Sequence, residues 1–256
     1  QKILELGPEN IMCFIAEPIL ASGGVIVPPT DYNYRCWQMV KKHEITYIAD
    51  EVVTAFGRLG HWFSSEKVFG IVPDIIIFAK GVTSGYIPMG GYAVSESFLA
   101  SFSGENAEDC LYSNGYPWGG SPVACAAALA CWDIIETEKL LDRVLEIGPY
   151  FQEQLRSLLD IPLVGNVRGE GLMAAVEMTI EGHNEEDLLE KDYAIGEMVD
   201  QHCQTLGLLV RPFINICIIS PPLIISREQV DELVSILRHG LELTLTDLRD
   251  QGIWVD

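Results

Sequence analysis

The sequence predicts an α/β fold, in which a mostly parallel sheet with helices on both faces is followed by a smaller α+β domain. Short apolar runs bounded by Gly, Pro or Asp recur through the first hundred residues, and such runs are typical of buried strands. They are residues 11–16, 45–49, 75–79 and 92–94. A helical pattern separates the first two runs, and strand–helix–strand order with strands apolar throughout indicates a parallel sheet covered on both faces.

The helix between the first two runs is expected to begin after the segment 28–31, which reads Pro-Pro-Thr-Asp. Thr30 or Asp31 can cap such a helix, because a short polar side chain accepts a hydrogen bond from the first free backbone N–H groups. The apolar residues that follow suit one face of an amphipathic helix; they are Tyr34, Trp37, Met39 and Val40.

The second half of the chain has a different rhythm. An Ala-rich segment with Pro122 near its first position predicts a closely packed helix that runs to about Thr137. Beyond it we expect a helix over 138–159, one or two strands over 164–178, a helix over 185–206, short strands at 208–210 and 216–219, and a terminal helix over 226–249. Ser226 and Gln229 have the spacing of a capping box. The sequence therefore predicts a partial large domain over 1–137 and a small domain over 138–256.

Charge and hydropathy exclude several classes of protein. The 256 residues carry 16 Lys and Arg against 37 Asp and Glu, and a formal net charge of −21 argues against nucleic acid as a partner. Hydrophobic residues at 48% and charged residues at 21% are typical of a compact globular protein. No apolar run approaches the roughly 18 residues that a membrane span needs. No signal peptide is visible after Gln1.

The seven cysteines form no C-x-x-C pair and fall mostly within apolar stretches. An odd number of such residues predicts reduced core thiols in a cytosol-like compartment, so we expect a cytoplasmic protein. The histidines show no metal-ligand spacing, and no metal is expected.

Chemistry-bearing side chains follow two of the predicted strands. Asp50 and Glu51 come directly after the run 45–49, and Lys80 comes directly after the run 75–79. In an open parallel sheet, ligands bind at the carboxyl ends of the strands. A lysine that ends an apolar run is unusual, because burying an ammonium group is costly unless the group is paired or neutralised. An unprotonated amine is what Schiff-base chemistry requires, so Lys80 is a candidate catalytic residue.

These residues also allow other interpretations. Lys80 could extend into solvent at a strand end while Asp50 caps a helix, and the residues alone leave this reading about as probable as the catalytic one. An apolar run that ends in Asp-Glu also resembles a Walker B element, but the phosphate-binding sequence that must accompany it is lacking. Tyr47 stands where the second histidine of a zincin would be, and no G-x-G-x-x-G follows a strand.

Several motifs extend over essentially the whole chain. They are ADEVVTAFGRLG at 49–60, PDI at 73–75, AKGVTSGYIPMG at 79–90, GGSPVACAAA at 119–128, RGEGL at 168–172, and Arg-Pro at 211–212 followed by Pro-Pro at 221–222. Together they resemble the class III aminotransferases, which are fold-type-I enzymes that use pyridoxal 5′-phosphate. The resemblance covers the later part of that family's chain, so it implies a large domain that lacks its amino-terminal part.

The resemblance implies roles for four residues. Lys80 would hold the coenzyme covalently, be released by the incoming amine and then carry a proton as the general base. Asp50 would pair with the ring nitrogen and keep it protonated, which preserves the ring as an electron sink. Val52 would pack on one face of the ring. Arg211 would receive a substrate carboxylate, a pairing that guanidinium geometry favours, although a strand-end arginine is also often part of a structural ion pair.

The chain departs from the family pattern at two positions. Ser22 stands where the ornithine and γ-aminobutyrate branches have a gating glutamate, which favours the broader ω-amino-acid or amine:pyruvate branch. Pro117 stands where a threonine usually reaches the coenzyme phosphate of the partner subunit, and proline offers neither a hydroxyl nor an N–H. The backbone N–H groups of Trp118 or Gly119 could replace that contact.

The sequence therefore predicts a transaminase that moves an amino group from an amine or ω-amino acid to an oxo acid, with pyruvate as the expected acceptor. The resemblance implies a homodimer. One alternative is an aminomutase or racemase of the same family. Another, of a different class, is a non-catalytic or incomplete chain that acts as a partner subunit.

Overall fold

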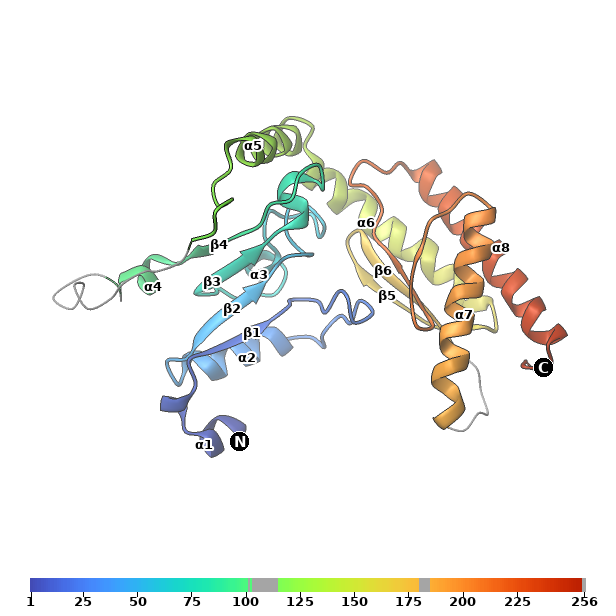
Figure 1. Ribbon diagram of the computed structural model, residues 1–256, viewed down its shortest axis with the longest axis horizontal. Coiled ribbons are helices and arrows are strands. Elements are labelled where there is room, and N and C mark those ends of the chain that lie inside the picture. Colours follow the sequence, from blue (N-terminus) through green and yellow to red (C-terminus); the bar gives the residue numbers. More distant parts are fainter. Residues whose placement is uncertain (101, 103–114, 180–184, 255–256) are drawn as a thin grey trace. The chain divides into compact units, whose positions relative to one another are not determined.

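A computed structural model of the chain describes residues 1–100, 102, 115–179 and 185–254, and these form two compact units (Figure 1). The first unit comprises Gln1–Ile19 and Pro28–Leu141. The second comprises Leu20–Val27 and Asp142–Asp256. A short segment of the amino-terminal half, Leu20–Val27, thus belongs to the second unit. The division expected from the sequence, at residue 137, places that segment in the first.

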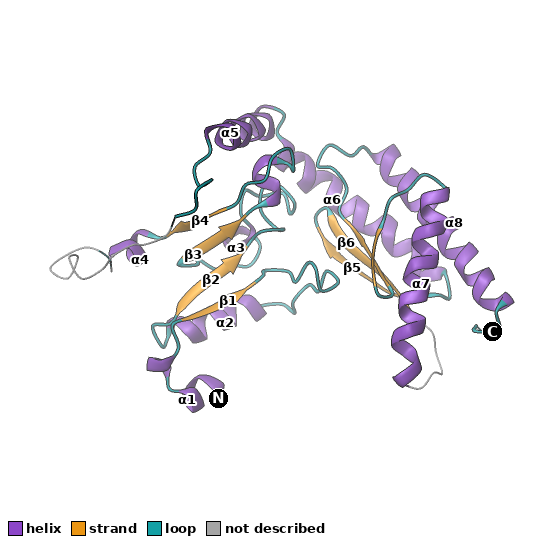
Figure 2. Ribbon diagram, viewed as in Figure 1, coloured by secondary structure: helices purple, strands orange, loops and turns teal. Residues whose placement is uncertain are grey.

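The first unit is built on a four-stranded sheet with the strand order β1-β2-β3-β4 (Figure 2). The strands are β1 (Cys13–Ala16), β2 (Thr46–Asp50), β3 (Ile75–Phe78) and β4 (Gly91–Val94). The first three are parallel, and β4 is antiparallel to β3. Each strand overlaps one of the predicted apolar runs, so the mostly parallel α/β sheet is confirmed.

Helical segments precede, separate and follow these strands along the chain. They are α1 (Lys2–Leu6), η1 (Pro8–Asn10), α2 (Tyr32–Lys41), α3 (Ser64–Lys67), η2 (Lys80–Thr83), α4 (Glu96–Ala100) and α5 (Pro122–Thr137). The limits predicted for α5 are confirmed. Helix α2 also begins as predicted, but the side chain of Asp31 does not cap it. Asp31 has a left-handed backbone with a φ of 63°, whereas a capping side chain requires an extended backbone at that position.

One apolar cluster of the first unit lies between α2 and β2. Its buried side chains are Val40, Ile45, Tyr47, Ala49 and Ile71. No residue of β1 or β3 is fully buried, and Ile15 in the edge strand β1 is 54% exposed. The expectation that every strand is buried is therefore wrong. Apolar composition predicts a strand, but the burial of that strand depends on which elements pack against it.

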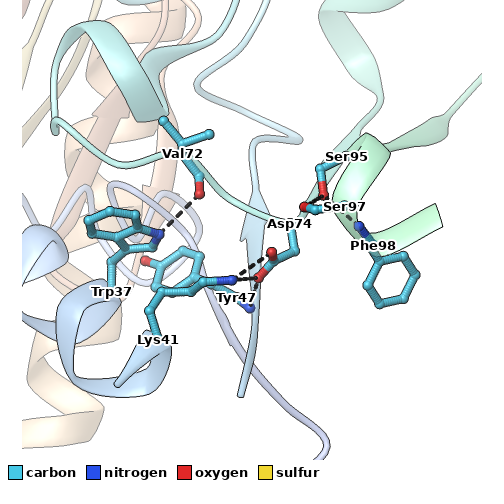
Figure 3. Close-up of polar contacts among 8 residues, drawn as sticks. All are labelled: Trp37, Lys41, Tyr47, Val72, Asp74, Ser95, Ser97 and Phe98. Carbon is cyan, nitrogen blue, oxygen red and sulfur yellow. Dashed lines mark hydrogen bonds and ion pairs between the residues drawn. The ribbon is translucent and has the colours of Figure 1, made fainter. Parts of the chain in front are cut away.

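Asp74 connects three elements of the first unit (Figure 3). Its carboxylate accepts a hydrogen bond from Lys41 Nζ at 2.7 Å and another from the backbone N–H of Tyr47 at 2.8 Å. Its own N–H donates to the Tyr47 carbonyl at 2.9 Å, and the N–H of Ser95 donates to the Asp74 carbonyl at 2.8 Å. Because Asp74 directly precedes β3, these bonds fix the position of β3 between β2 and β4.

The second unit contains an antiparallel sheet with the strand order β5-β6-β8-β7. The strands are β5 (Val164–Glu170), β6 (Met173–Met178), β7 (Arg211–Phe213) and β8 (Ile216–Ile219). The helical segments are α6 (Leu140–Arg156), whose first two residues belong to the first unit, η4 (Ser157–Asp160), α7 (Glu185–Thr205) and α8 (Arg227–Asp250). The strand predicted at 208–210 is wrong. The strand begins at Arg211 and includes Pro212, which an edge strand tolerates.

The capping box predicted at the start of α8 is confirmed. The hydroxyl of Ser226 accepts a hydrogen bond from the N–H of Gln229 at 3.2 Å, and the N–H of Ser226 donates to the Gln229 side chain at 3.0 Å. These bonds satisfy backbone donors that the helix itself cannot pair.

The segment Leu20–Val27 is packed within the second unit. Val25 is fully buried, and the Nε of Arg168 donates to the carbonyl of Gly24 at 2.9 Å. Gly24 has a φ of 107°, and a Cβ atom there would lie only 2.8 Å from the Cδ1 of Ile216. The positive φ favours glycine at this position, and a larger residue would also require the end of the Ile216 side chain to shift.

Candidate active site

Asp50 and Lys80 lie at the same edge of the first sheet. Asp50 is the last residue of β2 and pairs in register with Ile77 of β3. The N–H of Glu51 then donates to the Ile77 carbonyl at 2.9 Å, so β2 and β3 remain aligned just past the strand end. Lys80 follows β3 by two residues and is the first residue of η2. Because β2 and β3 are parallel, a carboxylate and an amine leave adjacent strand ends at the edge where α/β sheets bind ligands.

Lys80 is exposed rather than buried against the apolar strand, so the expectation of a buried amine is wrong. The chain leaves β3 through the extended residue Ala79 and turns at once into η2, which carries Lys80 into solvent. Lys80 itself has a left-handed backbone with a φ of 42°. Such a conformation costs a non-glycine residue about 1–3 kcal/mol and persists only where the surrounding structure holds it.

Asp50 is half-buried and has acceptor capacity left. Its Oδ1 accepts a hydrogen bond from the N–H of Val52 at 3.1 Å. Within the part of the chain that the structure describes, this is the only hydrogen bond of the Asp50 carboxylate, so Oδ2 remains for a donor on a bound molecule. Val52 is half-buried in the turn directly after β2.

Glu51, beside Asp50, is a buried carboxylate whose role the sequence reasoning missed. It is 0% exposed, and its oxygens accept five hydrogen bonds from a serine pair and a threonine. Oε2 accepts from the N–H of Ser64 at 2.6 Å, the hydroxyl of Ser64 at 2.8 Å and the hydroxyl of Thr54 at 3.1 Å. Oε1 accepts from the N–H of Ser65 at 2.8 Å and its hydroxyl at 2.5 Å. The adjacent serines at 64 and 65 are visible in the sequence, but nothing local indicates that they meet Glu51.

An aromatic cluster lies beside Lys80. Phe56 is at its centre and packs edge-to-face against Trp62, Phe63 and Phe78, with ring centroids 6.3, 5.6 and 5.7 Å away. It also stacks on Trp132 of α5 at 5.9 Å. The cluster joins the loop after β2, the end of β3 and α5 into one apolar support below the strand ends.

Arg211 and Pro117 are both exposed. Arg211 is the first residue of β7, in the second unit, rather than the residue after a strand. Pro117 lies in a turn in which the N–H of Gly119 donates to the Tyr116 carbonyl at 2.9 Å. Two backbone N–H groups could replace the missing threonine hydroxyl. That of Gly119 already donates to Tyr116, so within the described part of the chain the N–H of Trp118 is the one left to contact a phosphate.

An apolar hollow in the first unit lies away from these residues. It has a volume of about 680 Å³ and is lined by α1, α2 and the amino-terminal ends of β1 and β2. Asp50 and Lys80 are at the opposite, carboxyl-terminal edge of the sheet. The hollow is therefore separate from the candidate active site.

Three further observations on the described residues concern membrane-spanning helices, metal-ligand clusters and disulfides. None of the helices that the structure describes is long and apolar enough to cross a bilayer. Within the same residues, no three His, Cys, Asp or Glu side chains gather as metal ligands would. Six cysteines are free thiols, and Cys110 lies outside the described residues.

The chain is similar to aminotransferases in sequence and in structure. Residues 1–241 match the family model "Aminotransferase class-III". The chain is 42% identical over 245 residues to a putrescine–pyruvate aminotransferase of Pseudomonas aeruginosa, covering 95% of this chain and 52% of that protein. It is 38% identical over 242 residues to the mitochondrial γ-aminobutyrate transaminase 1 of Oryza sativa subsp. indica, covering 94% of this chain and 46% of that protein.

Solved structures show the same likeness. An amine transaminase from an uncultivated Pseudomonas species, in its PLP-bound form, has a TM-score of 0.87 and 38% identity, covering 95% of this chain and 55% of that chain. An (S)-enantioselective ω-transaminase from Thermomicrobium roseum has a TM-score of 0.87 and 35% identity, covering 95% and 54%. The chain thus spans about half the length of the relatives that it matches.

Proposed function

Because the chain belongs to the class III aminotransferase family, we propose that it takes part in moving an amino group from an amine or ω-amino acid to an oxo acid, with pyruvate as the acceptor. The observation that carries this proposal is the placement of Asp50 and Lys80 at adjacent ends of two parallel strands. A carboxylate and an amine in this arrangement can hold opposite ends of one flat molecule.

The residues at this edge fit pyridoxal 5′-phosphate, the cofactor of the family. Oδ2 of Asp50 is available to accept a hydrogen bond from a protonated ring nitrogen, and the exposed amine of Lys80 is accessible to an aldehyde. When bound, this cofactor supplies an electron sink that stabilises negative charge at the substrate carbon.

Each residue has one proposed task. Lys80 would hold the coenzyme and, as the general base, would take a proton from the substrate Cα and return it. Asp50 keeps the proton on the ring nitrogen, because a nearby carboxylate favours the charged form. Val52 would pack on one face of the ring and help to exclude water from it.

Replacing Lys80 tests the proposal directly. In Lys80→Ala we expect no covalent capture of pyridoxal phosphate after borohydride reduction, and at least a thousandfold loss of alanine formation from pyruvate. Lys42→Ala, which removes another exposed lysine, is the control and should retain both. Capture at an unchanged level in Lys80→Ala would disprove the assignment. Racemisation or amino-group migration without alanine formation would instead favour an isomerase of the same family.

Arg211 is proposed to bind the carboxylate of ω-amino acid and oxo acid substrates. A guanidinium at an exposed strand end can pair bidentately with a carboxylate and move aside for amines that lack one. We expect Arg211→Ala to raise the KM for carboxylate substrates about tenfold or more and to leave the KM for a diamine within about twofold. Equal effects on both classes would contradict this role.

The substrate class follows from two observations. Ser22 carries no charge and so cannot act as the gating glutamate of the ornithine and γ-aminobutyrate branches, which favours uncharged and cationic donors over a dedicated γ-aminobutyrate site. The likeness to a putrescine–pyruvate aminotransferase supports a diamine as donor. Comparing putrescine and γ-aminobutyrate as donors to pyruvate measures this preference.

We propose a cytoplasmic homodimer as the working assembly, since the family builds its site from two subunits. Sedimentation velocity in the presence of pyridoxal phosphate would measure the dimer, and fractionation of the source cells would measure the location.

A second candidate is a chain without catalytic activity of its own. Pro117 stands where the family usually has a threonine, and it offers neither a hydroxyl nor an N–H to a phosphate. A titration of the 256-residue chain with pyridoxal phosphate distinguishes the two functions. Dissociation constants in the micromolar range support the transaminase, whereas binding weaker than about 1 mM supports a partner subunit.

A further inference from the structure

Residues 51–65 run from the end of β2 into the first turn of α3, and this segment, called the loop below, connects the buried Glu51 to the backbone of Lys80. We propose that Glu51 is a positioning residue, which closes this loop and thereby holds Lys80 in the backbone conformation that presents its amine beside Asp50. The proposal rests on the assignment of Lys80 as the residue that holds the coenzyme.

The Glu51 carboxylate holds the two ends of the loop together. We call this point, where Glu51 meets Ser64 and Ser65, the neck of the loop. Ser64 and Ser65 donate to the carboxylate through both their backbone N–H groups and their hydroxyls, over distances of 2.5–2.8 Å. These four bonds join the first residue of the loop to its last two, 13 and 14 residues away. A fully buried carboxylate with this set of donors is held in one orientation, because leaving any of these hydrogen bonds unmade inside the protein is costly.

The body of the loop is ordered by backbone hydrogen bonds. The N–H of Phe56 donates to the Trp62 carbonyl at 2.8 Å, and the N–H of Gly57 donates to the His61 carbonyl at 2.9 Å. The N–H of Ala55 donates to the Glu51 carbonyl at 3.2 Å. Phe56 has a φ of 55° and is only 4% exposed, so this turn fixes where its ring lies.

Phe56 in turn supports the residues on both sides of Lys80. Its ring packs against Phe78, two residues before Lys80, with centroids 5.7 Å apart. On the other side, a Cβ atom at Gly81 would lie 2.9 Å from the Cβ of Phe56 and 3.5 Å from the Ala55 carbonyl oxygen. Gly81 is therefore in direct contact with the loop, and a left-handed Lys80 lies between two residues that Phe56 holds.

Opening the neck removes this support. Without the Glu51 carboxylate, Ser64 and Ser65 lose the acceptor that joins them to the end of β2. Phe56 is then free to move away from Gly81. Lys80 relaxes toward a right-handed backbone, and its amine leaves the position set by the sheet register.

Hydrogen exchange tests this connection without the coenzyme. The amides of Val82 and Ser84 donate to Ala79 and Gly81, both at 3.1 Å, and they report on the turn that contains Lys80. We expect exchange at both amides to be at least tenfold faster in Glu51→Gln. In the matched control Glu66→Gln, an exposed residue of α3, exchange should stay within twofold of wild type. Faster exchange at Ser64 and Ser65 with no change at Val82 and Ser84 would overturn the proposal.

A second experiment separates positioning from general damage to the site. Pyridoxamine phosphate has no aldehyde, so its binding does not involve the Lys80 amine. In Glu51→Gln we expect its dissociation constant to stay within threefold of wild type, while the rate of covalent capture of pyridoxal phosphate by Lys80 falls at least tenfold. Equal losses in both would show that Glu51 serves the whole site and would contradict a positioning role.

Phe56→Leu provides an independent variant that keeps the neck intact, and it serves if Glu51→Gln does not fold. It should reproduce both the faster exchange at Val82 and Ser84 and the slower capture, while leaving exchange at Ser64 and Ser65 unchanged. Unchanged exchange at Val82 and Ser84 in Phe56→Leu would refute the connection. If the wild-type chain itself does not capture pyridoxal phosphate, the proposed function fails, and the exchange results still decide whether Glu51 sets the Lys80 turn.

Discussion

The two units bury their residues in different ways. In the second unit, one continuous apolar cluster includes side chains from α6, β6, α7 and α8, and it runs along the chain from Val144 to Leu248. In the first unit the described apolar contacts fall into the α2–β2 cluster and the aromatic cluster around Phe56, β1 and β3 are only partly buried, and two carboxylates also connect the elements. Glu51 closes the loop after β2, and Asp74 fixes the start of β3.

This difference fits the demands on each unit. Apolar packing contributes most of the stability of a folded domain but is nearly non-directional. Hydrogen bonds to a carboxylate contribute less net free energy but fix positions closely, since they weaken steeply with distance and angle. The unit that contains Asp50 and Lys80 uses these directional bonds as well as apolar contacts, and the following substitutions test the contrast.

Phe151→Ala should have the largest effect on stability. Phe151 is fully buried in α6, and its removal leaves a cavity that costs about 3–5 kcal/mol of the free energy of unfolding of the second unit. Urea denaturation followed by hydrogen exchange at β6 amides measures this loss. Leu145→Ala, on the same helix but 49% exposed, is the control and should cost less than about half as much. Similar losses for both would mean that the second core is not close-packed.

Alkaline pH should destabilise the second unit before the first. Burial raises the pKa of the Cys203 thiol from 9.0 to about 11, so the folded state holds this proton more tightly than the unfolded state. The resulting stability is complete below pH 9 and is lost as the pH rises from 9 to 11, by on the order of 3 kcal/mol. Burial raises the pKa of Tyr47 in the first unit from 10.0 to about 12, so its contribution is lost only above pH 10.

The measurement for this prediction is the free energy of unfolding of each unit at pH 8, 9, 10 and 11. Cys203→Ala should show a shallower decline in the second unit than wild type and leave the first unit unchanged. An identical slope in wild type and variant would show that Cys203 is not the titrating group.

Asp74→Asn should destabilise the first unit by a smaller amount. The amide keeps an acceptor for the Tyr47 N–H, but this hydrogen bond no longer goes to a charged group, and hydrogen bonds to charged groups contribute about 1.5–3 kcal/mol. Faster hydrogen exchange in β2 and β3 would report the loss. Lys41→Met is the control, because Lys41 is 40% exposed in its side chain and an exposed ion pair contributes about 0–1 kcal/mol. A larger effect for Lys41 than for Asp74 would contradict the central role of the carboxylate.

Ser226→Ala should have the smallest effect of the four. Loss of the capping hydroxyl costs about 1 kcal/mol, because one backbone N–H at the start of α8 loses its partner. The apolar core of the second unit should remain folded, and exchange should increase only in the first turn of α8. Cooperative unfolding of the whole unit would show that polar contacts matter as much there as in the first unit.

The sequence by itself determined the element order, the α/β class and the edge of the sheet where Asp50 and Lys80 lie. Apolar runs and helical spacing are local patterns, and parallel strands bring their carboxyl ends together whatever covers them. The motifs around these residues determined the family resemblance in the same way, because each motif is a short stretch of adjacent residues.

Only the tertiary structure decided how these residues are held. Glu51 finds its partners 13 and 14 residues further on, Asp74 finds Tyr47 27 residues back, and Leu20–Val27 packs within the second unit through Arg168. It also decided that Lys80 is exposed in a left-handed turn instead of buried at the end of its strand. Hydrogen-bond partners and burial depend on which distant segments come into contact on folding. Local sequence patterns do not predict these contacts.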